Sequence, residues 1–207
     1  MNDKILIIGD NEAAKWHPLK KVGDRLEAIL KDYDVTLTED YSRLTPDECK
    51  KYGLLVNYAD AWQTKGTRQA AGAILAYVAT GGSLLTLHSG IIMNSTPEME
   101  FLQGGRFIEH PEACNLTYAP TDAAHPILDG ISPFTVFEEP YRLALADLAA
   151  HELLMTYSHD GQNWPAAWTL LFGAGKVVYL SPGHQAQSFY DEMFSKLILN
   201  SVIWAMT

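Results

Sequence analysis

The segment from Gly81 to Gly90, GGSLLTLHSG, constrains the fold of this chain more than any other stretch. A glycine pair opens a short apolar run, Leu84 to Leu87, which stops abruptly at His88. An apolar run bounded by turn residues is typical of a fully buried strand in a parallel sheet. In open α/β sheets, ligands gather at the carboxyl ends of the strands, where a sharp turn exposes one side chain. Here that side chain is His88, at a position where a cysteine or serine nucleophile is more usual.

The remainder of the first ninety residues predicts alternating strands and helices. Hydrophobic periodicity places strands at 5–8, 34–38, 54–58 and 84–87, and helices at 23–31, 46–51 and 67–80. Thr45 is expected to cap the second helix, with Glu48 three residues on, and Gly81 to end the third. This order of elements predicts a parallel sheet with right-handed crossovers.

The second half of the chain has a different pattern. Closely spaced strand candidates lie at 114–118, 134–137, 152–158, 166–172 and 176–180. The segments Asp160-Gly161 and 173–175 are natural hairpin turns, so some of these strands should be antiparallel additions to the sheet. Residues 189–206 predict a closing amphipathic helix.

Composition narrows the class of protein. The 207 residues are 47% hydrophobic and 11% aromatic, which fits one globular domain. The formal charge of −10 argues against a nucleic-acid partner, which requires a basic face. Cys49 and Cys114 form no C-x-x-C pattern and are expected to be reduced thiols. The apolar run at 4–9 is too short for a signal peptide, and no apolar stretch approaches the roughly 20 residues of a membrane span. We therefore expect a cytoplasmic protein without a membrane partner.

Three histidines fall at predicted strand ends. His17 lies just beyond the first strand, His88 ends the fourth, and His184 follows the strand at 176–180. Since the carboxyl ends of parallel strands meet at one edge, the three side chains should project toward the same rim. Any one of them could be an ordinary structural histidine, but their convergence favours a functional site.

Other polar residues have more local explanations. Glu138 and Glu139 close the strand at 134–137; neighbouring residues alternate across a strand, so only one carboxylate can face a cleft. That carboxylate could act as a general acid or base, or orient an imidazole. His110 and His125 both precede proline and therefore belong to loops, where His125 is expected to stabilise a turn. The remaining two, His151 and His159, are expected at the surface.

Several familiar catalytic patterns are absent. Two or three histidines with a carboxylate have the composition of a catalytic zinc site, but no H-x-H or H-E-x-x-H spacing is present. We therefore expect no cofactor, with a divalent metal such as zinc as the alternative. Ser89 lacks the G-x-S-x-G context because Leu87 stands where glycine is needed. No G-x-G-x-x-G motif or P-loop lysine follows the first strand.

Taken in order along the chain, these motifs resemble the ThuA-like (trehalose utilisation) family, which has the class I glutamine amidotransferase-like fold. The resemblance covers nearly the whole chain and rests on short motifs: His17, the 81–90 segment, 104–107 with His110-Pro111, 125–127 with Gly130, 138–141, Pro165 with Trp168, 175–179, Gly183-His184 and 203–205. The family commonly has Asp-Glu-x-Tyr where this chain has Glu138-Glu139-Pro140-Tyr141, and often Gly-Arg where Gly175-Lys176 stands.

The resemblance implies a fold and a substrate class. The expected fold is a flavodoxin-like three-layer α/β sandwich over residues 1–207, with a mostly parallel central sheet and antiparallel additions in the C-terminal half. With His88 at the position of the amidotransferase cysteine, glutamine hydrolysis through a thioester is not available. The family is associated with the utilisation of disaccharides or oxidised sugars, so a small sugar or sugar derivative is the expected partner. Aromatic side chains suited to stacking on a sugar ring are Trp16, Tyr58, Trp62, Tyr141 and Trp168.

Three functional hypotheses follow. In the first, the protein is a sugar-modifying enzyme of hydrolase, lyase or isomerase type. Its catalytic residues are His88, His184 and Glu139, and its substrate-binding residues are His17, His110, Tyr141 and Trp168. The second is a non-catalytic sugar-binding or regulatory protein. The third is a metal-dependent hydrolase that uses His17, His88 and His184. The oligomeric state is left open, with a homo-oligomer among the alternatives.

Overall fold

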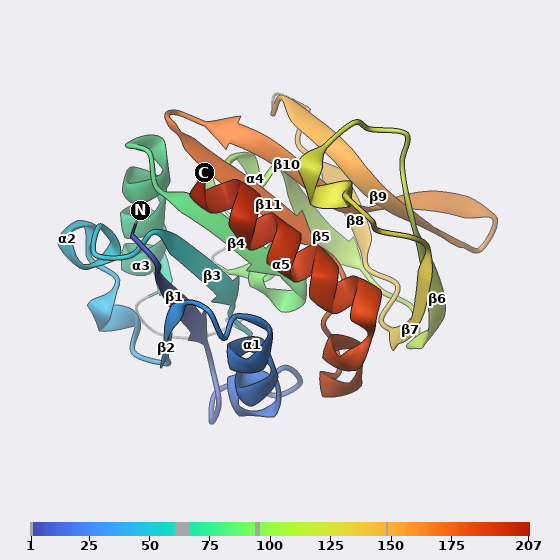
Figure 1. Cartoon of the computed structure of the whole chain (residues 1–207), viewed down its shortest axis with the longest axis horizontal. Coiled ribbons are helices and arrows are strands. Elements are labelled where there is room, and N and C mark those ends of the chain that lie inside the picture. The colour runs from blue at the N-terminus through green and yellow to red at the C-terminus, as the bar shows by residue number, and fades with distance from the viewer. Residues whose placement is uncertain (1, 61–66, 94–95, 148) are drawn as a thin grey trace.

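A large mixed sheet forms the centre of the molecule (Figure 1). The computed structural model describes residues 2–60, 67–93, 96–147 and 149–207. Within these residues the sheet has nine strands, in the spatial order β2 (Asp34–Thr38), β1 (Lys4–Gly9), β3 (Leu54–Tyr58), β4 (Ser83–Leu87), β11 (Gly175–Leu180), β10 (Gln162–Phe172), β9 (His151–His159), β6 (Cys114–Pro120) and β7 (Phe134–Glu138). The pairs from β2 through β11 are parallel, and the pairs from β11 through β7 are antiparallel. The predicted parallel sheet with antiparallel additions is confirmed.

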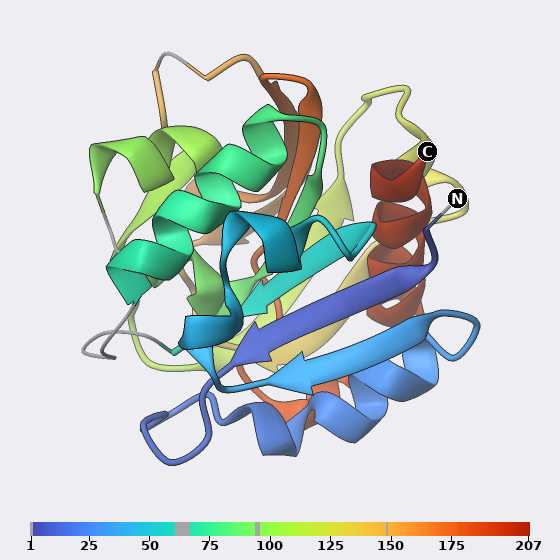
Figure 2. The same ribbon diagram turned by 90° about the vertical axis from the view of Figure 1, so that its left-hand side faces the viewer.

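Helices cover both faces of this sheet, as the two ribbon views show (Figures 1 and 2). On one face lie α1 (Gly23–Ile29) and α5 (Glu192–Met206), and on the other α2 (Pro46–Cys49), α3 (Thr67–Ala79) and α4 (Pro97–Gln103). Two hydrophobic cores result, because successive strand residues point to opposite faces. Ile5 and Ile7 pack in the core beneath α5, whereas Leu6 and Ile8 pack in the core beneath α3. The three-layer sandwich follows from this division.

Local sequence signals act where they were expected. The Thr45 hydroxyl accepts a hydrogen bond from the Glu48 amide and caps α2. Asp160 and Gly161 both have positive φ, 51° and 72°, which is the backbone required by the tight hairpin joining β9 to β10. Gly173 also has a positive φ, 60°, in the turn between β10 and β11.

Some elements differ from the prediction. The closing helix begins at Glu192 and not at 189, because the Asp191 carboxylate accepts hydrogen bonds from the Met193 and Phe194 amides and caps it there. The residues before it form the short 3₁₀ helix η5 (Ala186–Tyr190). Helix α4 and the small antiparallel pair β5 (Gly105–Glu109) and β8 (Arg142–Leu145) were not predicted. Further 3₁₀ turns are η1 (Leu19–Lys21), η2 (Tyr41–Arg43), η3 (His88–Ile92) and η4 (Pro126–Leu128).

Among the described residues, no helix combines the length and the apolar character needed to cross a membrane.

Candidate functional site

Four side chains meet at the carboxyl edge of the parallel strands. His17 lies in the loop after β1, His88 directly follows β4, His184 follows β11, and Glu139 follows β7. One nitrogen or oxygen atom from each lies within 4.8 Å of the others. We call this group the histidine–glutamate cluster. The structure thus brings together the three strand-end histidines and the second residue of the acidic pair.

The turn at His88 has the strained backbone of a nucleophile elbow. His88 has a φ of 42°, in the left-handed region that residues other than glycine rarely occupy. Two residues on, a Cβ at Gly90 would lie 2.3 Å from the backbone oxygen of Asn57, so the turn packs against β3 too closely for any side chain. Strain of this kind persists where the surrounding structure enforces it, and it is concentrated at functional sites.

The cluster is tightly spaced. His17 Nε2 lies 3.0 Å from His184 Nδ1 and 3.2 Å from His88 Nε2. Glu139 Oε2 lies 3.3 Å from His184 Nδ1, 3.4 Å from His88 Nε2 and 3.5 Å from His17 Nε2. His88 is fully buried and His17 is 4% exposed, whereas the side chains of Glu139 and His184 are 11% and 17% exposed. Solvent therefore reaches the cluster from the side of Glu139 and His184.

Asp60 supports His17 and was not singled out from the sequence. Its Oδ2 accepts hydrogen bonds from the Trp16 and His17 amides, and its Oδ1 lies 3.4 Å from His17 Nδ1. The sequence signal that could have identified Asp60 was its position, two residues after β3 at the same edge of the sheet as His17.

A backbone carbonyl fixes the ring of His88, whose Nδ1 lies 2.7 Å from the Ser181 carbonyl oxygen. A carbonyl oxygen only accepts, so this nitrogen carries a proton.

The two adjacent glutamates have different environments. Glu138 accepts hydrogen bonds from the Gly183 and His184 amides, both at 2.9 Å, and so fixes the backbone that carries His184. The Tyr58 hydroxyl donates to the Gly183 carbonyl on the same loop. Burial raises the pKa of Glu138 to about 7. Glu139 alone faces the histidines, as strand alternation predicts.

Burial and charge act in opposite directions on the ionisable groups. Burial lowers the pKa of His88 to about 4. Burial also lowers the pKa of His17, but the carboxylates of Asp60 and Glu139 outweigh it and leave that pKa above its ordinary value. For Glu139, burial raises the pKa, yet the surrounding histidines bring it well below its usual range. His88 is therefore neutral and Glu139 is ionised at neutral pH.

His110 and Tyr141 lie beside the cluster. Tyr141 is buried, and its ring stacks on His88 with centroids 4.1 Å apart and on His110 with centroids 5.6 Å apart. His110 is more open, with 37% of its side chain exposed, and its Nε2 lies 3.7 Å from Glu139 Oε1. Its other nitrogen lies 2.8 Å from the Pro111 carbonyl oxygen. His110 thus lies at the rim, and Tyr141 packs behind it.

The structure does not bring every predicted residue to the cluster. Trp168 is fully buried in the core beneath α3, where its indole N–H donates to the Gln103 carbonyl and its ring packs on Tyr179. Trp62 lies outside the described residues. Trp16 is 48% exposed next to His17. His125 accepts a hydrogen bond from the Ile127 amide and stabilises the turn at η4, as expected.

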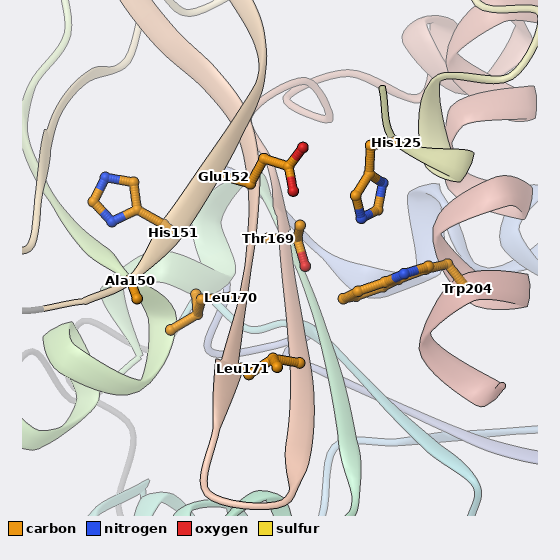
Figure 3. Close-up of a pocket in the computed structure, with 8 residues that line it drawn as sticks. All are labelled: His125, Ala150, His151, Glu152, Thr169, Leu170, Leu171 and Trp204. Atoms are coloured by element: carbon orange, nitrogen blue, oxygen red, sulfur yellow. The ribbon is translucent and has the colours of Figure 1, made fainter. Parts of the chain in front are cut away.

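A separate pocket of about 450 Å³ lies on another part of the molecule (Figure 3). Its lining residues are His125, Ala150, His151, Glu152, Thr169, Leu170, Leu171 and Trp204. Leu171 pairs with Lys176 at the start of β11, whereas His184 follows the end of that strand. The pocket is therefore at the opposite end of β11 from the histidine–glutamate cluster and shares no residue with it.

Comparisons with known proteins agree with this architecture. A family model described as trehalose utilisation (ThuA) matches residues 4–205. No curated protein matches the chain in sequence. A ThuA-like protein from Bacteroides uniformis is 19% identical over 98% of this chain and 90% of its own, with a TM-score of 0.80. One from Parabacteroides merdae is 19% identical over 100% and 91%, with a TM-score of 0.79. A cytoplasmic protein from Salmonella typhimurium is 16% identical over 98% and 99%, with a TM-score of 0.69. At these identities, the similarity to solved structures shows a shared fold.

Proposed function

Because the chain belongs to the ThuA family of trehalose utilisation proteins, we propose that it is an enzyme acting on a disaccharide or keto-sugar at the histidine–glutamate cluster. The family supports the substrate class, and the geometry of the cluster supports the location of the reaction. In this proposal the sugar lies over the open side of the cluster, next to Glu139, His184 and His110.

The observation that carries the proposal is the convergence of four largely buried ionisable groups. They come from segments as far apart as residues 17 and 184, and each is held by its own loop. Burying ionisable groups costs free energy unless they are fully paired. Within the described part of the chain, the buried oxygen Glu139 Oε2 makes no hydrogen bond of regular geometry, although three imidazole nitrogens lie 3.3 to 3.5 Å from it. An arrangement this costly to stability is best explained by a reaction that uses it.

The rim of the cluster suits a sugar. Trp16 is half-exposed, with Lys15 Nζ over its ring at 4.4 Å from the centroid, and this pair offers a C–H stacking surface and a hydrogen-bond donor. His110 offers a polar side chain for hydroxyl groups. Tyr141 is buried beneath His110 and holds it in place, so its contribution to sugar binding is indirect.

Two chemistries fit the same four side chains. One is direct acid–base catalysis by the histidines and Glu139. The other is activation of a water or a sugar oxygen by a cation held among them. These side chains do not fit hydrolysis of glutamine through a thioester, because His88 stands at the turn where that reaction needs a thiolate.

The test is turnover of trehalose and of a trehalose derivative with one ring hydroxyl oxidised to a ketone. The purified chain is incubated with each sugar, with and without added zinc, and the sugars are followed by NMR. We expect the wild type to convert at least one of them. Glu139→Gln keeps the size of the side chain but loses its charge, and should lower the rate by about 100-fold or more. The control His151→Gln, in the separate pocket of Figure 3, should retain the wild-type rate.

Two results would contradict the proposal. If the wild type binds the sugars but leaves them unchanged under both conditions, the protein is a binding or regulatory protein. If Glu139→Gln is as active as the wild type, the reaction occurs elsewhere.

A further inference from the structure

The spacing of the histidine–glutamate cluster matches the coordination shell of a metal ion. A tetrahedral ion with ligands at about 2.0–2.1 Å places each pair of ligand atoms roughly 3.3 Å apart. Five of the six separations in the cluster lie between 3.0 and 3.5 Å. The sixth, between His88 and His184, lies within the 4.8 Å that bounds the group.

The proton positions favour a cation at the centre. His88 Nδ1 donates to the Ser181 carbonyl, so its Nε2 presents a lone pair in the neutral ring. His17 Nδ1 faces the Asp60 carboxylate, which favours a proton on that nitrogen and a lone pair on Nε2. These two Nε2 atoms lie 3.2 Å apart, with the Glu139 carboxylate beside them. Lone pairs and a negative charge that face one another repel, and a cation between them turns the repulsion into bonds.

The outer contacts are those that metal-binding histidines normally have. Such a histidine donates its second ring N–H to a carboxylate or to a backbone carbonyl, which fixes its orientation. The Ser181 carbonyl fills this role for His88, and the Asp60 carboxylate is placed to fill it for His17, with Oδ1 3.4 Å from Nδ1. For His184, Glu138 fixes the backbone through two amide hydrogen bonds.

We infer that the cluster binds one divalent first-row transition ion, zinc being the best match, through His17 Nε2, His88 Nε2, His184 Nδ1 and Glu139 Oε2. Three imidazole nitrogens and one carboxylate oxygen suit zinc and its neighbours, whereas magnesium and calcium prefer oxygen ligands alone. This inference does not depend on the identity of the substrate. It makes His88 and His184 ligands, in place of the acid–base role expected for them from the sequence.

One side of the ion remains open to a substrate. The Glu139 and His184 side chains are the two partly exposed ligands, and the second oxygen of Glu139 faces the half-exposed His110. A water or a sugar oxygen could therefore approach from this side, as a fifth ligand or by displacing Glu139, while His17 and His88 hold the ion from the buried side.

The first measurement is the metal content of the full chain, expressed without an affinity tag and analysed by elemental mass spectrometry. We expect about one equivalent of a divalent transition ion per chain. After removal of that ion with a chelator, Co²⁺ should bind with the strong visible absorption of a four- or five-coordinate site, and Zn²⁺ should displace it.

Variants locate the ion. His184→Gln and Glu139→Gln change the two partly exposed ligands and should weaken Zn²⁺ binding by more than 100-fold. Asp60→Asn keeps an acceptor for the two amides but removes the charge that faces His17, and should weaken binding by about 10- to 100-fold. His151→Gln is the matched control and should bind zinc as the wild type does. Circular dichroism verifies that each variant is folded.

The inference is overturned if the folded wild type contains less than about a tenth of an equivalent and takes up neither Co²⁺ nor Zn²⁺. It is also overturned if His184→Gln and Glu139→Gln bind zinc as tightly as the wild type. Failure of the proposed function would look different: the ion would be bound while every sugar stayed unchanged. Conversely, sugar turnover by a protein that takes up neither Co²⁺ nor Zn²⁺ would support the enzyme and overturn the metal site.

Discussion

The seven histidines of this chain differ in what surrounds them, and those surroundings assign their roles. His125 accepts a backbone hydrogen bond and stabilises a turn. His110 lies half-exposed at a rim, and its ring stacks on Tyr141. The three histidines at strand ends each direct a ring nitrogen at the same carboxylate oxygen, Glu139 Oε2, whereas His110 faces the other oxygen from 3.7 Å. Residue type alone does not distinguish the histidines of the cluster from the structural ones, whereas position at a strand end does.

The low pKa of His88 makes the stability of the metal-free protein depend on pH. Burial lowers this pKa from 6.5 to about 4, so between these values the unfolded chain binds a proton at His88 that the folded chain does not. Stability from this group is therefore present above pH 6.5 and is lost as pH falls toward 4. Its size is on the order of 3 kcal/mol.

The measurement is urea unfolding of wild type and His88→Asn in the presence of a chelator, between pH 7 and pH 4. Burial raises the pKa of Glu138, so protonation of Glu138 changes stability in the opposite direction over part of this range. Both proteins contain Glu138, and the difference between their unfolding free energies therefore isolates the contribution of His88. A difference in unfolding free energy that stays constant across the range would refute the prediction.

At the scale of secondary structure, the helix and strand boundaries follow from short-range signals. Thr45 at α2 and Asp191 at α5 accept hydrogen bonds from amides that the first turn of a helix leaves unpaired. Strands β1, β3 and β4 were predictable because they are continuous apolar runs buried on both faces. β5 and β8 are short and mixed in polarity, and they pair only with each other, so no periodic pattern marks them.

The cap of α5 gives a test at this scale. Asp191→Ala removes the acceptor for the Met193 and Phe194 amides and should lower the free energy of unfolding by about 1 kcal/mol. Asp191→Asn retains a side-chain oxygen and should cost much less. Equilibrium urea denaturation measures both variants, and equal losses for the two would show that the hydrogen bonds of the cap are not the cause.

At the scale of the whole molecule, the site depends on the order and the twist of the sheet. β11 comes last in the chain but pairs with β4, with Leu180 opposite Leu87, and this places His184 beside His88. β7 is the far edge of the antiparallel half, four places from β11, yet Glu138 bonds to the loop after β11. The antiparallel half must therefore curve back over the strand ends, and that curvature brings Glu139 to the histidines.

A bound ion would join these distant segments only in the folded state. Zinc at 100 times its dissociation constant should therefore raise the free energy of unfolding by about 2.7 kcal/mol. Thermal unfolding with zinc and then with excess chelator measures the gain and its reversal, and His184→Gln should show little change. A similar gain in that variant would mean that zinc stabilises the protein from another site.

The sequence by itself determined the alternation of strands and helices, the parallel half of the sheet and the edge at which the site lies. These depend on burial patterns, turns and caps, which act over a few residues, and on strand polarity. Only the tertiary structure decided how closely the predicted side chains meet and which others join them. It added Asp60 and the Ser181 carbonyl, and it placed Trp168 in the core and not in the site. His17 lies 3.0 Å from His184, which is 167 residues away in the sequence, and 3.5 Å from Glu139. Crossovers and sheet curvature set these distances, and no local sequence pattern encodes them.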